Sequence, residues 1–207
     1  MVKIAVFASG NGGNFQSIVE KSKKDNSIKY SVELLIVDKK NSYAEKRAEK
    51  LGIPCYIVIP KEFSTKENYE KKIIEILKEN KIKLIALAGY MRIISSTLLK
   101  AYENKIINIH PAYLPNYPGK DGIGDAFKAG AKETGVTIHY VDEGVDSGEI
   151  IYQEKLKIKD EWNIEKLEEE IHKIEHRIYP AILNELSENI KDWNHINFGG
   201  NQKWKEL

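Results

Sequence analysis

The stretch KIAVFASGNGGN, residues 3–14, decides how the fold is interpreted. Residues 3–8 form a short apolar run of the kind that makes a buried β-strand. The glycine-rich turn ASGNGGN, residues 8–14, follows this run and leads into a segment that can begin a helix. Strand, glycine turn and helix in this order form the first unit of an α/β fold, in which the helix N-terminus attracts an anion.

The glycine turn predicts a site for a single phosphate group. A dinucleotide motif needs Gly-x-Gly-x-x-Gly, but when it is counted from Gly10 its last position is Phe15. The lysine that follows a triphosphate-binding loop is also missing from the sequence. Asp38 ends the second apolar run and is a possible ribose ligand. The alternative is that the turn only connects a strand to a helix and binds nothing.

The rest of the first half repeats the same alternation. Apolar runs predict further strands at 32–37, 55–59, 84–89 and 105–109. Polar segments with helical spacing lie between them, as in 66–79, and Ser42 with Glu45 and Ser64 with Glu67 have capping-box spacing at helix starts. This alternation predicts a doubly wound, mostly parallel sheet with helices on both faces.

The pattern changes after residue 130. Strand-like runs at 135–141 and 149–158 are separated only by DEGVDSG, which predicts an antiparallel hairpin extension of the sheet. Helical spacing returns over 163–178. We expect one domain over residues 1–190 and a C-terminal tail over residues 191–207.

The composition excludes several classes of protein. The chain has 207 residues, with 32 basic and 31 acidic side chains, so it has no electrostatic signature of binding to nucleic acid or membrane. Cys55 is the only cysteine, and no apolar run approaches the roughly 20 residues of a spanning helix. The N-terminus does not have the pattern of a signal peptide. These features favour a soluble cytoplasmic protein.

The stretch NIHPAYLPNYPG, residues 108–119, predicts the reactive site. Asn108 and His110 are two residues apart at the end of a strand, so their side chains point to the same face, at the edge where α/β sheets bind ligands. An amide and an imidazole there can stabilise an oxyanion, and histidine can transfer a proton. Three prolines make the following loop stiff. The alternative is a loop-capping asparagine and a structural histidine.

The sequence offers no nucleophile for a covalent intermediate. It contains no Gly-x-Ser-x-Gly motif, and Cys55 lies inside an apolar run. Acyl transfer would then need a nucleophile on the substrate and a carboxylate near His110. Asp146, close to Gly144 and Gly148, is the acidic residue of the hairpin loop that can approach most closely, although acidic loop residues are usually only solvated.

The segment HKIEH, residues 172–176, matches an inverted zinc-peptidase motif. A zinc site also needs a third ligand from another element, and no candidate follows in the sequence, so we expect no metal. Glu175, with His172, can instead face an amine-bearing substrate, or only water.

Taken together, the motifs resemble those of the glycinamide ribonucleotide formyltransferases, folate-dependent enzymes of purine synthesis. The similarity extends from Lys3 to YPAIL at 179–183, and SGNGGN, LAGYMRI, NIHPAYLPNYPG and GVTIHYVDEGVDSGEII occur in the family's order and spacing. The resemblance implies a Rossmann-like formyltransferase fold. It also implies transfer of the formyl group from 10-formyltetrahydrofolate to the amine of glycinamide ribonucleotide, by a monomer or a homodimer.

The resemblance assigns roles to individual residues. The catalytic residues would be Asn108, His110 and Asp146. The ribonucleotide would be bound by Gly12, Gly13, Asn14, Lys66 and Glu175. The folate would be bound by Met91, Arg92, Ile93, Ile94, Asn108, Val141, Asp142 and Asp146.

Some positions depart from the family pattern. Gly13 replaces a frequent serine and Asp121 a frequent histidine, whereas His139 matches a family histidine whose role can be structural. Two related enzymes share this chemistry, but we do not expect their usual additional domains here, and a non-catalytic module is a further alternative. A formyltetrahydrofolate hydrolase usually has an additional N-terminal domain, and a methionyl-tRNA formyltransferase has an additional, more basic C-terminal domain. A non-catalytic module would bind a phosphate ligand without formyl transfer.

Overall fold

The computed structural model describes residues 1–189, so the predicted tail at 191–207 lies outside the described residues. All strands belong to one seven-stranded sheet with the order β3-β2-β1-β4-β5-β6-β7. The strands are β1 (Val2–Ala8), β2 (Tyr30–Val37), β3 (Cys55–Ile57), β4 (Leu84–Leu87), β5 (Ile106–His110), β6 (Glu133–Tyr140) and β7 (Ile150–Lys157). Strands β1 to β5 are parallel, and β6 is antiparallel to both of its neighbours. The predicted mostly parallel sheet with an antiparallel hairpin is therefore confirmed.

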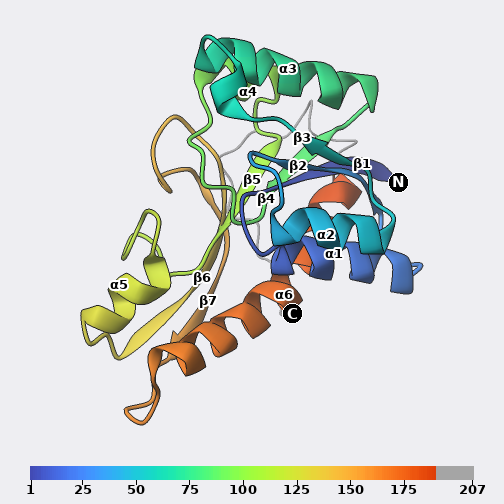
Figure 1. Cartoon of the computed structure of the whole chain (residues 1–207). Helices are drawn as coiled ribbons and strands as arrows, with labels where there is room; N and C mark the ends of the chain where they lie inside the picture. The colour runs from blue at the N-terminus through green and yellow to red at the C-terminus, as the bar shows by residue number, and fades with distance from the viewer. Residues whose placement is uncertain (190–207) are drawn as a thin grey trace.

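Helices cover both faces of the sheet (Figure 1). The helices are α1 (Gly13–Lys24), α2 (Tyr43–Leu51), α3 (Lys66–Glu79), α4 (Ser96–Ala101), α5 (Gly122–Lys128) and α6 (Ile164–Asn189). One apolar core lies between the sheet and α1, α2 and α6, and the other lies between the sheet and α3 and α4. None of the helices in residues 1–189 is long and apolar enough to cross a lipid bilayer.

One local prediction needs correction, and one helix is longer than its spacing indicated. The N-cap of α3 is Thr65, whose side chain accepts from the N–H of Asn68, whereas Ser64 accepts from the Asn68 side chain instead. Helix α6 extends beyond the helical spacing seen at 163–178, through Pro180 to Asn189. Its apolar stripe continues beyond the proline with buried residues such as Leu183, and this packing outweighs the lost backbone hydrogen bond. By contrast, the cap at Ser42 forms as predicted, by accepting from the N–H of Glu45.

The strand order places a crevice at the carboxyl end of the sheet. Strand β1 has β2 on one side and β4 on the other. The chain first adds β2 and β3 on one side of β1, and then adds β4 and the later strands on the other side. The loops that follow β1 and β4 therefore diverge over opposite faces of the sheet. Ligands of α/β proteins collect at such a point.

Candidate active site

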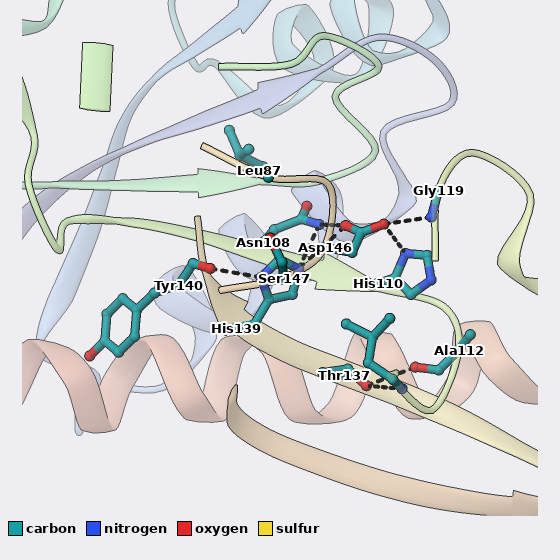
Figure 2. A network of polar contacts seen from close by, with 12 residues as sticks. Leu87, Asn108, His110, Ala112, Gly119, Thr137, His139, Tyr140, Asp146 and Ser147 are labelled. Carbon is teal, nitrogen blue, oxygen red and sulfur yellow. Dashed lines mark hydrogen bonds and ion pairs between the residues drawn. The ribbon is translucent and has the colours of Figure 1, made fainter. Parts of the chain in front are cut away.

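A cavity of about 800 Å³ opens at this crevice. Its wall is built from the glycine turn after β1, the segment after β4, the end of β5, the β6–β7 loop and one face of α6. The predicted catalytic residues Asn108, His110 and Asp146 all line it. Residues that are far apart in the sequence therefore meet in one place, and Figure 2 shows the polar network that connects them.

Asp146 is the hub of this network. Its Oδ1 lies 3.3 Å from Nδ2 of Asn108, and its Oδ2 lies 3.4 Å from Nδ1 of His110. Oδ2 also accepts a 2.7 Å hydrogen bond from the N–H of Gly119, in the proline-rich loop. Strand parity accounts for the meeting, because Asn108 and His110 point to the same face of β5, towards this carboxylate.

The pKa of Asp146 is lowered despite its burial. Burial raises the pKa of this carboxyl, but the side chain of His139, the N–H of Gly119 and the neighbouring His110 outweigh that effect. The carboxylate form is thus favoured in the folded protein.

The backbone of the hairpin loop is shaped to present Asp146. Asp146 itself has a φ of 52°, a left-handed conformation that non-glycine residues rarely adopt. Gly148 leaves no room for a side chain, since a Cβ there would lie 1.8 Å from the carbonyl oxygen of Tyr140. The sequence indicated a close approach of Asp146 but not this strain.

His139 is a member of the network that the sequence placed only by resemblance. It lies directly opposite Asn108 in the antiparallel β5–β6 pairing, and its side chain is buried. Its Nδ1 donates to the carbonyl of Tyr140 at 2.7 Å, so Nε2 of the neutral ring is an acceptor. Nε2 lies 3.2 Å from Nδ2 of Asn108. Cross-strand pairing was the signal that could have identified it.

The network orients the Asn108 amide. A carboxylate only accepts hydrogen bonds, so the amide nitrogen rather than the oxygen faces Asp146. Both N–H groups of Asn108 are then used, one by Asp146 and one by His139, over long distances of 3.3 and 3.2 Å. The predicted donation to an oxyanion requires one of these weak bonds to be exchanged.

His110 is held from both sides of its ring. Its Nε2 lies 2.8 Å from the carbonyl oxygen of Tyr117, which can only accept, so this nitrogen carries the proton in the neutral ring. A Cβ on Gly122 would lie 2.9 Å from Nε2, which shows how tightly the following loop closes over the ring. His110 is only 2% exposed, so bulk water has little access to it.

The glycine turn lies at another part of the same cavity. Gly12 has a φ of 76°, and α1 begins at Gly13 with no side-chain cap and no acidic residue in its first turn. Uncapped N–H groups at a helix start are suited to an anion. A Cβ on Gly13 would lie 3.0 Å from Nε2 of His176, which is a tight contact.

Glu175 lines the cavity from α6 and is buried. It accepts a 2.6 Å hydrogen bond from Nδ1 of His172, which raises the pKa of that histidine against the opposing effect of burial. Burial lowers the pKa of His176. Among residues 1–189, no group of three or more His, Cys, Asp or Glu side chains is arranged to hold a metal ion. The HKIEH segment therefore places a hydrogen-bonded carboxylate in the cavity wall.

The segment after β4 presents apolar side chains to the cavity. Met91 and Ile93 are 53% and 60% exposed, an unusual exposure for large apolar residues, whereas Ile94 is buried. Arg92 donates from Nε to Asp38 at 2.7 Å, so the possible ribose ligand is instead the buried partner of this arginine. Val141 and Asp142 of the hairpin loop also line the cavity.

Three residues discussed from the sequence are not in the cavity wall. Lys66 is the first residue of α3 and is exposed, outside the cavity lining. Asp121 caps α5 through the N–H of Gly124 and pairs with Lys128 at 3.2 Å, so it has a structural role. Burial raises the pKa of Cys55 to about 11, which agrees with an unreactive thiol.

Residues 2–183 match the formyl transferase family, and the chain belongs to that family. The phosphoribosylglycinamide formyltransferase of Bacillus subtilis (strain 168) is 49% identical over 186 residues, covering 90% of this chain and 95% of that protein. The crystal structure of phosphoribosylglycinamide formyltransferase from Bacillus halodurans has a TM-score of 0.88 at 43% identity, covering 94% of this chain and 100% of that chain. The trifunctional purine biosynthetic protein adenosine-3 of Gallus gallus is 37% identical over 182 residues, 88% of this chain but 18% of that protein.

Proposed function

We propose that this protein is a phosphoribosylglycinamide formyltransferase, which transfers the formyl group of 10-formyltetrahydrofolate to the amine of glycinamide ribonucleotide in purine synthesis. One observation carries the proposal. Asn108, His110 and Asp146 converge in a cavity that also contains the phosphate-type turn. Similarity to enzymes with this name over nearly the whole chain supports the same activity.

The cavity offers suitable partners for both substrates. The N–H groups of the turn at Gly12, Gly13 and Asn14 would bind the phosphate, and the buried Glu175 would contact the ribose or the amine. The exposed apolar residues of Met91–Ile94 and the hairpin loop would frame the pterin ring. A contribution from Lys66 would need α3 or the loop before it to move towards the ligand.

The reaction needs no covalent bond to the protein. The amine nitrogen attacks the formyl carbon, and the carbonyl electron pair moves onto oxygen. An N–H group of Asn108 gives up its long hydrogen bond within the network and donates to this oxyanion instead. The Nε2–H of His110 can donate to the same oxyanion once its hydrogen bond to the carbonyl of Tyr117 is broken. Collapse of the intermediate restores the carbonyl and breaks the bond to N10 of the folate. Asp146 takes the amine proton, through water, and the folate nitrogen gains one.

The test is the dependence of tetrahydrofolate release on the ribonucleotide. Purified protein is mixed with 10-formyltetrahydrofolate, and free tetrahydrofolate is followed with and without glycinamide ribonucleotide. We expect turnover only when both are present. Equal release without the ribonucleotide would identify a hydrolase, and no release in either mixture would identify a binding module.

A cytoplasmic location and a monomeric or homodimeric state belong to the same proposal. The similarity to a purine-synthesis enzyme of Bacillus subtilis supports the cytoplasm, where such a substrate would be made and used. Cell fractionation tests the location. Light scattering coupled to size-exclusion chromatography tests the oligomeric state.

A further inference from the structure

Helix α2 donates hydrogen bonds to two carbonyl groups of the glycine turn. The carbonyl of Gly10 accepts a 3.0 Å hydrogen bond from the N–H of Ala44, in the first turn of α2. The carbonyl of Asn11 accepts a 2.9 Å bond from Nε of Arg47, one turn later. A carbonyl oxygen facing a phosphate would repel it, so these two bonds favour the orientation in which N–H groups face the ligand.

Arg47 holds the turn with more than one bond. Besides Nε, its Nη2 donates to the side-chain oxygen of Asn11 at 3.0 Å, and its Nη1 donates to the side chain of Gln16 on α1. Its guanidinium also stacks on the ring of Tyr43, 4.7 Å from the centroid. One planar group thus connects the turn, α1 and α2, and it lines the cavity itself.

The glycine turn packs closely against α2. Gly12 has a left-handed φ, and a Cβ there would lie 2.8 Å from both Cα and Cβ of Ala44. The turn is therefore pressed against α2 at Gly12 and tied to it at Gly10 and Asn11. No side chain caps α1 itself, so the N–H groups of its first turn stay available to an anion.

We infer that Arg47 is a positioning residue for the phosphate of the ribonucleotide: its guanidinium fixes the turn in the conformation whose N–H groups face the ligand. The inference rests on the proposed function for the identity of the ligand. It concerns binding of the phosphate end and not the formyl-transfer step, because Arg47 has no contact with Asn108, His110 or Asp146 among its hydrogen bonds. Lysine has a single ammonium group and cannot reproduce the three directed donors.

Two variants and one control test this role. R47M removes all donors and keeps the apolar stem, R47K keeps the charge but not the fork, and K46M removes an exposed neighbouring charge on the same helix. The binding of ribose 5-phosphate is measured by calorimetry, which needs no turnover. We expect both Arg47 variants to bind about tenfold or more weakly, since charged hydrogen bonds contribute at that level, and K46M to bind as the wild type does.

Kinetics separates positioning from general damage. With glycinamide ribonucleotide, R47M should raise KM for the ribonucleotide while kcat and KM for the formyl donor stay near wild type. Wild-type affinity for ribose 5-phosphate in R47M, or no binding by the wild type, would overturn the inference. The inference would also be overturned if R47M raised KM equally for both substrates and lowered the melting temperature. If R47K bound ribose 5-phosphate as tightly as the wild type does, the positive charge alone would account for binding, and the inference would be refuted. If the wild type binds the phosphate but shows no formyl transfer, the proposed function fails while the positioning role is still judged by the binding data.

Discussion

The carboxylate of Asp146 contacts the predicted catalytic residues while its backbone adopts an unusual conformation. It accepts from Gly119, contacts Asn108 and His110, and does so from a left-handed conformation that costs on the order of 1–3 kcal/mol. Strain of this kind persists only where surrounding contacts compensate for it. The contacts of this carboxylate therefore serve the site and the loop together.

Loss of either His110 or Asp146 should abolish most activity. We expect His110→Ala and Asp146→Asn to lower kcat by about 10²–10⁴-fold, because each removes a group that moves protons or stabilises charge in the transition state. Steady-state kinetics with glycinamide ribonucleotide gives the measurement. Glu143→Gln is the matched control, since Glu143 is exposed in the same loop and is outside the cavity lining. Near-wild-type rates in both test variants would refute the assignment.

The lowered pKa of Asp146 makes a prediction about stability. A carboxyl whose pKa falls on folding stabilises the protein above its unfolded value, near 3.8, and this contribution is lost as the pH falls through the lower folded value. The stability difference between wild type and Asp146→Asn should therefore be constant near neutral pH and shrink below about pH 4. Urea unfolding at a series of pH values measures it. A difference that grows on acidification would show the opposite sign of the shift.

The sequence predicted much of the residue-level site. Strand parity was enough to direct Asn108 and His110 to one face, and flanking glycines indicated Asp146. The occupied N–H groups of Asn108 could not be foreseen, because they depend on the register that places His139 opposite it. Resemblance supplied Lys66, and nothing in its surroundings yet connects it to the cavity.

At the scale of elements, helix α3 fixes the segment after β4. Glu70 on α3 is 2% exposed, and it accepts hydrogen bonds from the N–H of Ser95 at 2.8 Å, from the N–H of Leu98 at 3.1 Å and from the Ser95 hydroxyl. This carboxylate caps α4 from outside. It therefore anchors the far end of the segment that begins with Met91.

Replacement of this buried cap should destabilise the contact between α3 and the start of α4. We expect Glu70→Gln to lower the free energy of unfolding by about 1–3 kcal/mol, because an amide NH₂ would face donors that need an acceptor. Glu67→Gln, one turn earlier on the exposed face of α3, is the control. Chemical denaturation of both variants decides the point, and equal stability of the two would show that Glu70 is not a structural cap.

The elements that the sequence predicted well are those with strong periodicity. The strands and α3 follow from apolar runs and helical spacing. The short helices α4 and α5 were missed, since six and seven residues give too little periodicity. The course of α6 past Pro180 depends on burial against the sheet, which local propensity does not record.

At the scale of the whole molecule, the strand order brings the site together. The glycine turn follows β1, the apolar segment follows β4, and the predicted catalytic residues Asn108 and His110 end β5. These three strands are neighbours. The alternation of strands and helices predicted a ligand site at this edge. The position of the hairpin loop across it could not be derived, because loop conformation is set by contacts such as that between Asp146 and Gly119.

The most direct test of the account follows the formyl carbon itself. The protein is supplied with 10-formyltetrahydrofolate labelled with ¹³C in the formyl group and with glycinamide ribonucleotide, and the products are identified by NMR. The account predicts that the label appears in the formamide of formylglycinamide ribonucleotide, in an amount equal to the tetrahydrofolate released. Label found only in free formate, or remaining in the folate, would contradict it.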